Sequence, residues 1–227
     1  GRGGLIGAVG MIIAIFGTIF LHEGEVSGMV YGLIFTPIAI GTIIGWMTAK
    51  KVQMTKMPEL VSMFNGMGGA CAALISLIEF THLQHSGETT TTGTMIAIIA
   101  GLVIGSVSFS GSVIAFLKLN GTMAKPIRLP SYNMLNNAFM LFVLLFGSYI
   151  VYDGGNMMLA YALFAAALIY GILFTIPIGG ADVPVVISLL NSFTGLAAAF
   201  GGFLYGNKVM LTGGILVGSA GTLLTLI

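Results

Sequence analysis

Two side chains in this sequence are suited to chemistry, a carboxylate and an amide placed at the start of and within one apolar segment. Asp182 precedes Pro184, and Asn191 lies further along the same apolar run. This order predicts a helix with Asp182 as its N-cap, because proline is tolerated where the first N–H has no partner. Asn191 would lie roughly 10 Å along that helix, at about 1.5 Å per residue. Since a buried amide needs hydrogen-bond partners, Asn191 either holds helices together or belongs to a polar path.

The composition predicts what surrounds these side chains. Of 227 residues, 57% are hydrophobic and 7% are charged, whereas soluble domains carry about 25% charged residues. The net charge of +1 gives no basic excess, so we expect no nucleic-acid partner. The 34 glycines suit membrane helices that pack closely. The sequence therefore predicts an all-α, polytopic transmembrane helix bundle.

About eight apolar runs are long enough to cross a hydrocarbon core that is about 30 Å thick. The predicted spans are Gly4–Leu21, Gly28–Ala49, Pro58–Phe80, Thr94–Leu117, Met134–Tyr152, Met157–Ile178, Pro184–Leu204 and Val209–Ile227.

The basic residues predict the orientation of these spans. Seven of the eight basic residues fall on one side, namely Arg2, Lys50, Lys51, Lys56, Lys118, Lys125 and Arg128. Only Lys208 falls on the other side. The first side should therefore be cytoplasmic and carry the Asp182 loop, with His22, His82 and His85 at the outer face.

Two parts of the chain resemble each other. A shift of 126 residues aligns Pro58, Ser62, Asn65, Gly69, Ala72 and Ala73 with Pro184, Ser188, Asn191, Gly195, Ala198 and Ala199. A shift of 113 residues aligns Gly105-Ser106 with Gly218-Ser219. Spans two to four and six to eight are therefore interpreted as two parallel three-helix repeats, with a pseudo-two-fold axis along the membrane normal.

The repeated positions form a small polar stripe on one face of each helix. Ser188 and Asn191 lie on one copy and Asn65 on the other. Such a stripe is typical of a helix-packing seam, and it can also hold water along a path. An amide carries no net charge, so a proton path here needs water or a titratable group supplied from elsewhere. Both interpretations stay open.

Further titratable residues are few. Glu79 and His82 lie near the outer end of the third span, where they are either interfacial or exchange protons at its mouth. The Gly66–Gly69 segment lacks the last glycine of a dinucleotide loop and no strand precedes it. The sequence contains no Walker loop, clustered metal ligands or nucleophile triad. We therefore expect no catalytic, cofactor-binding or metal site in this chain.

Five ordered motifs carry a resemblance that covers essentially the whole chain. They begin at Met57 (Met-Pro-Glu-Leu-Val), Asn65 (Asn-Gly-Met-Gly-Gly), Phe109 (Phe-Ser-Gly-Ser-Val-Ile-Ala-Phe), Lys125 (Lys-Pro-Ile-Arg-Leu-Pro) and Gly179 (Gly-Gly-Ala-Asp-Val-Pro). Together they resemble the membrane domain of the beta subunit of proton-translocating NAD(P) transhydrogenase.

The resemblance implies a function and its partners. Members of that family couple hydride transfer between NAD(H) and NADP(H) on soluble domains to a proton crossing the membrane. It implies that residues 1–227 are a transmembrane fragment in the inner (cytoplasmic) membrane, without the family's preceding helix and following NADP(H)-binding domain. The expected partners are that domain, the alpha subunit with its NAD-binding domain, the lipid bilayer and a second copy of the complex in a dimer.

The resemblance also assigns roles to individual residues. Asp182 matches the acid at the cytoplasmic end that is thought to link the channel to the NADP(H) domain. Asn191 matches the channel asparagine of the same helix. The proton-handling histidine of the family falls on Asn65, so the titrating group would come from a helix of the alpha partner. The expected path comprises Asn65, Asn191, Ser188 and Asp182.

Two other functions remain possible from the sequence. The first is a secondary transporter with a substrate site between the parallel repeats. The second is a membrane scaffold whose amides only bind helices together.

Overall fold

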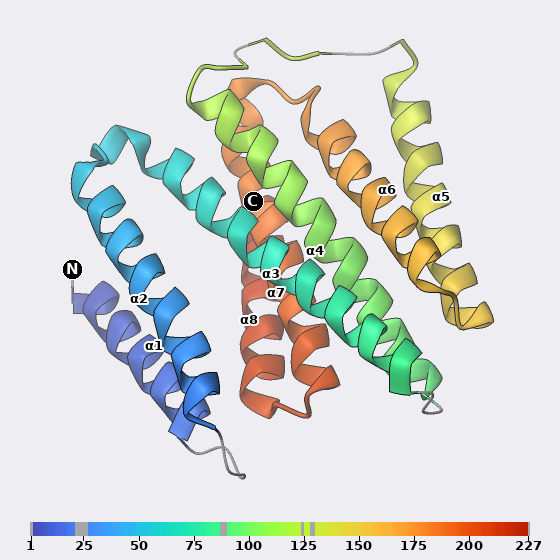
Figure 1. Cartoon of the computed structure of the whole chain (residues 1–227). Helices are drawn as coiled ribbons and strands as arrows, with labels where there is room; N and C mark the ends of the chain where they lie inside the picture. The colour runs from blue at the N-terminus through green and yellow to red at the C-terminus, as the bar shows by residue number, and fades with distance from the viewer. Residues whose placement is uncertain (1, 21–26, 87–89, 124, 128–129, 227) are drawn as a thin grey trace. The chain divides into compact units, whose positions relative to one another are not determined.

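A computed structural model of the chain describes residues 2–20, 27–86, 90–123, 125–127 and 130–226 (Figure 1). The predicted all-α fold is confirmed, since these residues form helices joined by turns and no strand occurs among them. The α-helices are α1 (Arg2–Phe20), α2 (Gly28–Lys51), α3 (Met57–Ser86), α4 (Thr92–Leu119), α5 (Tyr132–Asp153), α6 (Met157–Thr175), α7 (Val183–Leu204) and α8 (Lys208–Leu226). Short 3₁₀ turns at Met54–Lys56 and Gly180–Asp182 precede α3 and α7.

Helix lengths agree with a membrane-spanning chain. Within the described residues, seven helices are long and apolar enough to cross a bilayer, and Gly3–Gly17 of α1 forms a shorter apolar helix. The predicted boundaries lie within about two residues of these helices, with two exceptions. Helix α3 continues to Ser86, and α6 ends at Thr175 because Pro177 has no N–H with which to continue the helical hydrogen bonds.

The chain divides into two compact units, of which the first ends at Val52. Aromatic rings join its two helices. Phe20 of α1 stacks on Tyr31 of α2, with 6.3 Å between ring centroids, and lies 6.4 Å from Phe35. At the end of α2, the Lys50 ammonium lies 4.1 Å from the centre of the Trp46 ring. Such contacts favour a basic side chain at the membrane surface.

Helix α4 is the centre of the second unit, which comprises residues 53–227. It packs against α3, α5, α6 and α7, and two thirds of its apolar stretch is buried (Figure 1). Side chains such as Ile98 and Leu102 of α4 meet Phe80 of α3, Ile150 of α5 and Leu163 of α6 in one apolar core. Helix α4 therefore positions α3, α5, α6 and α7 relative to one another.

Glycines allow α3 and α4 to approach closely. A Cβ atom on Gly105 would lie 2.8 Å from both the Gly69 carbonyl oxygen and the Ala73 nitrogen. A Cβ on Gly69 would lie 2.8 Å from the Gly105 carbonyl oxygen. Each glycine thus occupies a place where the opposing backbone leaves no room for a side chain.

Helices α7 and α8 pack through the same set of contacts. A Cβ on Gly214 would lie 2.6 Å from the Gly195 carbonyl oxygen and 2.5 Å from the Ala199 nitrogen. These contacts match Gly105 with Gly214, so the alignment of Gly105 with Gly218 is wrong by one helical turn. Glycine recurs after four residues in α8, at Gly214 and Gly218, so the sequence alone does not indicate which of the two matches Gly105.

The two helix pairs differ in what surrounds them. Helix α4 packs against α7, whereas α8 makes no comparable contact with α3 in the described part of the chain. Helix α2, the first helix of one predicted copy, belongs to the other unit. The matched contacts support a duplicated helix pair, and the three-helix repeat with its two-fold axis stays a prediction.

Replacing Gly105 with alanine is expected to destabilise the chain by about 1–3 kcal/mol, the usual cost of overpacking. The added methyl group would meet backbone atoms of α3, which cannot move aside as a flexible side chain would. Thermal unfolding in detergent, followed by circular dichroism, measures the effect. Gly213→Ala is the matched control, since nothing lies within 4 Å of its added Cβ. Equal midpoints for the two variants would contradict this packing.

Candidate functional site

A buried polar cluster lies where α3 meets α4. Asn65 Nδ2 donates to Ser112 Oγ at 3.0 Å and, more weakly, to Ser108 Oγ at 3.4 Å. Ser62 Oγ donates to the Ser112 carbonyl oxygen at 2.8 Å. All four residues are buried. Burial in an apolar bundle makes each of these hydrogen bonds costly to lose.

The cluster continues onto α7. Ser108 Oγ donates to the Leu190 carbonyl oxygen at 2.9 Å and lies 2.6 Å from Thr194 Oγ1. Asn65 Oδ1 is buried and accepts no hydrogen bond from the described residues. We call Ser62, Asn65, Ser108, Ser112 and Thr194 the Asn65 cluster. It joins three helices and keeps one acceptor free.

Sequence reasoning missed Ser108, Ser112 and Thr194. Four serines alternate along α4, and only the pair separated by four residues, Ser108 and Ser112, faces Asn65. The other two, Ser106 and Ser110, donate to carbonyl oxygens one turn earlier in their own helix. The spacing of four was visible in the sequence, but nothing there indicated which pair faces α3.

The serines of α7 form a packing seam with α8. Ser188 Oγ donates to the Gly221 carbonyl oxygen at 3.0 Å, and Ser192 Oγ donates to that of Gly218 at 2.6 Å. Ser188 matches Ser62, whose acceptor is the carbonyl of Ser112. Along this face the polar stripe therefore bonds helices together.

Asn191 lies in a different environment from Asn65. Its side chain is exposed on the surface of the second unit, whereas Asn65 is 8% exposed. Among the described residues, no hydrogen bond joins Asn191 to the Asn65 cluster. The structure therefore does not bring the two amides together within this chain.

Asp182 is exposed directly before α7. It occupies the N-cap position, but the prediction of a capping hydrogen bond is wrong, because its side chain makes none. The 3₁₀ turn leads straight into α7 and gives Asp182 helical dihedral angles of −92° and −6°, whereas a cap needs extended backbone. In the described part of the chain its carboxylate has no hydrogen-bond partner, and it borders an open hollow of about 740 Å³ together with Tyr132 and Ile178.

Glu79 and His82 lie at the opposite end of the second unit. Helix α7 begins after Asp182 and ends before Tyr205, whose phenol donates to Glu79 Oε1 at 2.6 Å. Burial, the hydrogen bond to Glu79 and the charge of Glu79 together raise the pKa of Tyr205 to about 12, and burial contributes most. Tyr205 therefore remains a protonated donor at neutral pH. His82 is exposed one turn beyond.

Two of the remaining orientation markers lie at the ends that the prediction gives them. Lys118 bonds to carbonyls near Asp182, so it lies at the same end of the unit. His85 Nδ1 lies 2.8 Å from the Thr81 carbonyl oxygen near the end of α3, on the side of His82. His22 and Arg128 lie outside the described residues, as does the side chain of Arg2.

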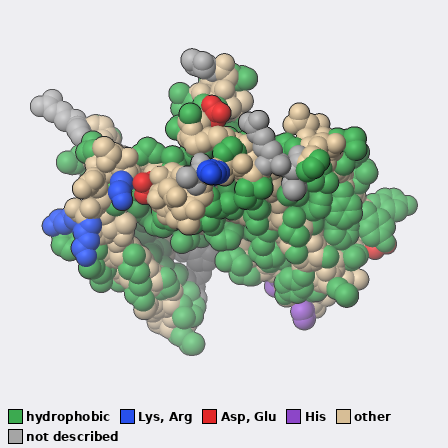
Figure 2. Space-filling model, turned by 90° about the horizontal axis from the view of Figure 1, so that it is seen from above, with side chains coloured by type: hydrophobic (Ala, Val, Ile, Leu, Met, Phe, Trp, Pro, Cys, Tyr) green, Lys and Arg blue, Asp and Glu red, His purple; other side chains and the backbone are tan. Residues whose placement is uncertain are grey.

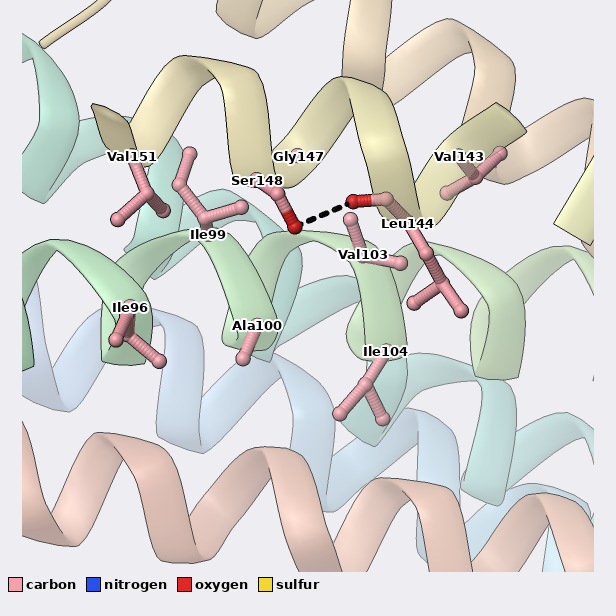
Figure 3. A pocket seen from close by; sticks show the side chains of 10 residues that line it. All are labelled: Ile96, Ile99, Ala100, Val103, Ile104, Val143, Leu144, Gly147, Ser148 and Val151. Atoms are coloured by element: carbon pink, nitrogen blue, oxygen red, sulfur yellow. Dashed lines mark hydrogen bonds between the residues drawn. The ribbon is translucent and has the colours of Figure 1, made fainter. Parts of the chain in front are cut away.

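An apolar hollow of about 410 Å³ lies between α4 and α5 (Figure 3). Ile96, Ile99 and Val103 line it from α4, and Val143 and Ser148 line it from α5. The Ser148 hydroxyl donates to the Leu144 carbonyl oxygen at 2.8 Å, as the dashed line in Figure 3 shows. Because the Ser148 hydroxyl is already hydrogen-bonded, the hollow offers few polar groups that could orient a polar substrate.

Hydrophobic side chains cover much of the face seen in Figure 2, and large apolar side chains such as Ile44, Leu145 and Leu224 are exposed. Membrane-length helices, an apolar exterior and a buried amide–hydroxyl cluster define a multi-pass membrane protein with a polar site inside its bundle. The family model of the NAD(P) transhydrogenase beta subunit matches residues 1–227, and the chain belongs to that family.

Two curated relatives support this assignment. They are NAD(P) transhydrogenase subunit beta of Rhodospirillum rubrum and the same subunit from a designated strain of that species. Each is 41% identical over 231 residues, an alignment that covers 100% of this chain and 49% of the relative. The chain thus spans about half the length of the curated relatives it matches.

Proposed function

We propose that this chain is the proton-translocating membrane domain of an NAD(P) transhydrogenase. It couples proton movement to hydride transfer between NAD(H) and NADP(H), which are bound on soluble domains outside this chain. The observation that carries the proposal is the Asn65 cluster, a buried line of hydrogen-bonding groups across three membrane helices in a member of this family.

The cluster has the chemistry of a path but lacks a titratable group. Hydroxyls and amides donate and accept hydrogen bonds, so together with water they can relay a proton. None of them holds the proton as a net charge at neutral pH. The unpaired Oδ1 of Asn65 is buried, so we expect its hydrogen-bond donor to be a water molecule inside the bundle. The proposal assigns the titrating group to a helix of the alpha subunit.

Asn191 supports the same arrangement from the surface. An amide exposed to lipid at membrane depth is unfavourable, because hydrocarbon offers it no hydrogen-bond partner. Its exposure in the isolated chain therefore favours a partner helix or water beside it. In the proposal, Asn191 and the neighbouring Ser188 line the path on the side of the alpha subunit.

The two ends of the path have different roles. Asp182 is exposed and makes no capping bond, so its carboxylate is available to the NADP(H)-binding domain. It communicates proton occupancy to that domain through its charge. Glu79, held by Tyr205, and the exposed His82 exchange protons at the outer mouth. The distribution of basic residues favours a protein in the inner membrane whose Asp182 end lies on the cytoplasmic side.

The complete protein contains further parts in this proposal. The alpha subunit supplies membrane helices and the NAD-binding domain, and the complex is a dimer. The transporter alternative is not favoured, because the whole chain matches the transhydrogenase beta subunit. The largely apolar hollow between α4 and α5 also gives a polar substrate little to bind.

Reconstitution tests the proposal directly. The complete protein, with its alpha subunit, is placed in proteoliposomes that enclose a pH-sensitive dye. Hydride transfer from NADPH to an NAD⁺ analogue is expected to change the internal pH, and an uncoupler should abolish that change while hydride transfer continues. Hydride transfer that never moves protons in tight vesicles would contradict the proposed function.

A further inference from the structure

The C-terminal end of α6 is capped by groups from other elements. The last carbonyls of a helix have no partner within it, and α6 has no basic residue in its own last turn. Tyr132 Oη donates to the Leu173 carbonyl oxygen at 2.7 Å. Lys118 Nζ donates to the carbonyl oxygens of Ile176 and Ile178, at 2.7 Å and 2.6 Å. Lys118 therefore bonds directly to the segment that leads to Asp182.

Lys118 is buried in the last turn of α4, with 6% of its surface exposed. A buried ammonium is costly unless strong acceptors surround it. The end of α6 supplies them, because the carbonyl end of a helix carries partial negative charge. The position of this side chain is thus tied to the position of the two carbonyls.

The same end of α4 also contacts the far side of the turn. Ala115 and the partly buried Leu119 pack against Val183 and Ile187, which begin α7. Ala115 and Val183 are fully buried. Helix α4 thus holds the segment before Asp182 by hydrogen bonds and the segment after it by packing.

We propose that Lys118 is a positioning residue that holds residues 176–182 against α4, so that the Asp182 carboxylate has one fixed place. Helix α4 also carries Ser108 and Ser112 of the Asn65 cluster. Lys118 therefore connects the helix that contacts the buried amide with the turn that presents the acid. The inference rests on the role proposed above for Asp182.

The test is a double-mutant cycle in the complete protein in proteoliposomes, with protons per hydride as the readout. Lys118→Met keeps the apolar stem and removes both hydrogen bonds. It is expected to lower the ratio about tenfold, a typical size for coupling between sites. Lys118→Arg should restore most of it, because guanidinium can also donate to two carbonyls.

The double variant with Lys118→Met and Asp182→Asn distinguishes positioning from general destabilisation. If Lys118 acts through Asp182, the double variant should match Asp182→Asn alone, to about twofold. Effects that multiply would overturn the inference. Lys125→Met, which removes an exposed lysine at the same end, is the charge control and should leave the ratio unchanged.

The outcomes separate this inference from the proposed function. A wild-type ratio in Asp182→Asn counts against the proposed function. A reduced ratio in Asp182→Asn with a wild-type ratio in Lys118→Met counts against Lys118 alone. If Lys118→Met is not recovered from the membrane, Lys118→Gln, which keeps a donor but no charge, takes its place in the same cycle.

Discussion

Replacing Asn65 with leucine is expected to reduce proton translocation and coupled hydride transfer together, by about 5–150-fold. The estimate follows from a buried hydrogen bond, whose loss costs about 1–3 kcal/mol, at about 1.4 kcal/mol per tenfold in rate. Leucine is similar in size but removes both donors to Ser108 and Ser112 and the free acceptor. Parallel assays of dye response and nucleotide reduction in proteoliposomes measure both rates.

A matched variant shows whether the buried position matters. Asn137 of α5 is exposed, and Asn137→Leu makes the same chemical change outside the cluster. It should leave both rates unchanged. Full proton translocation by Asn65→Leu, at a normal amount of protein in the membrane, would exclude Asn65 from the path.

Replacing Asp182 with asparagine is expected to uncouple the two processes. The exposed carboxylate makes no capping bond, so the substitution should change stability by less than about 0.5 kcal/mol. Its charge, however, is the signal proposed to reach the NADP(H)-binding domain. Hydride transfer should then proceed while protons per hydride fall about tenfold, within the usual range of coupling between sites.

Asp153 supplies the control for this substitution. It is an exposed acid that ends α5, the helix whose first residue, Tyr132, bonds near the Asp182 turn. Asp153 therefore lies at the other end of the unit, and Asp153→Asn should keep the wild-type ratio. An equal loss of coupling in both variants would indicate a general effect of surface charge instead of a role for Asp182.

Composition and hydrophobic pattern were sufficient to predict the helices. Long apolar runs separated by polar turns leave few alternatives in a membrane, where backbone groups must bond within the helix. The predicted helix ends were wrong where local hydrogen bonds determine the last residue of the helix. Helix α3 continues past Phe80 to Ser86, and Gln84 there donates to the Gly154 carbonyl oxygen at 3.1 Å.

The site was less predictable because it depends on how each helix is rotated. The sequence placed Asn65 and Asn191 at equivalent positions, yet one amide is buried against α4 and the other is exposed. That difference arises because α4 packs against both α3 and α7, whereas in the described part of the chain α8 packs extensively against α7 alone. A periodic pattern indicates which residues share a face but not which neighbour that face meets.

The most direct test measures protons moved per hydride transferred for the wild type, Asn65→Leu and Asp182→Asn in one set of proteoliposomes. We predict that Asn65→Leu loses both activities in proportion, whereas Asp182→Asn keeps hydride transfer and moves fewer protons per hydride. Wild-type rates and ratios in both variants would contradict a proton route that passes the buried amide and reports to the exposed acid.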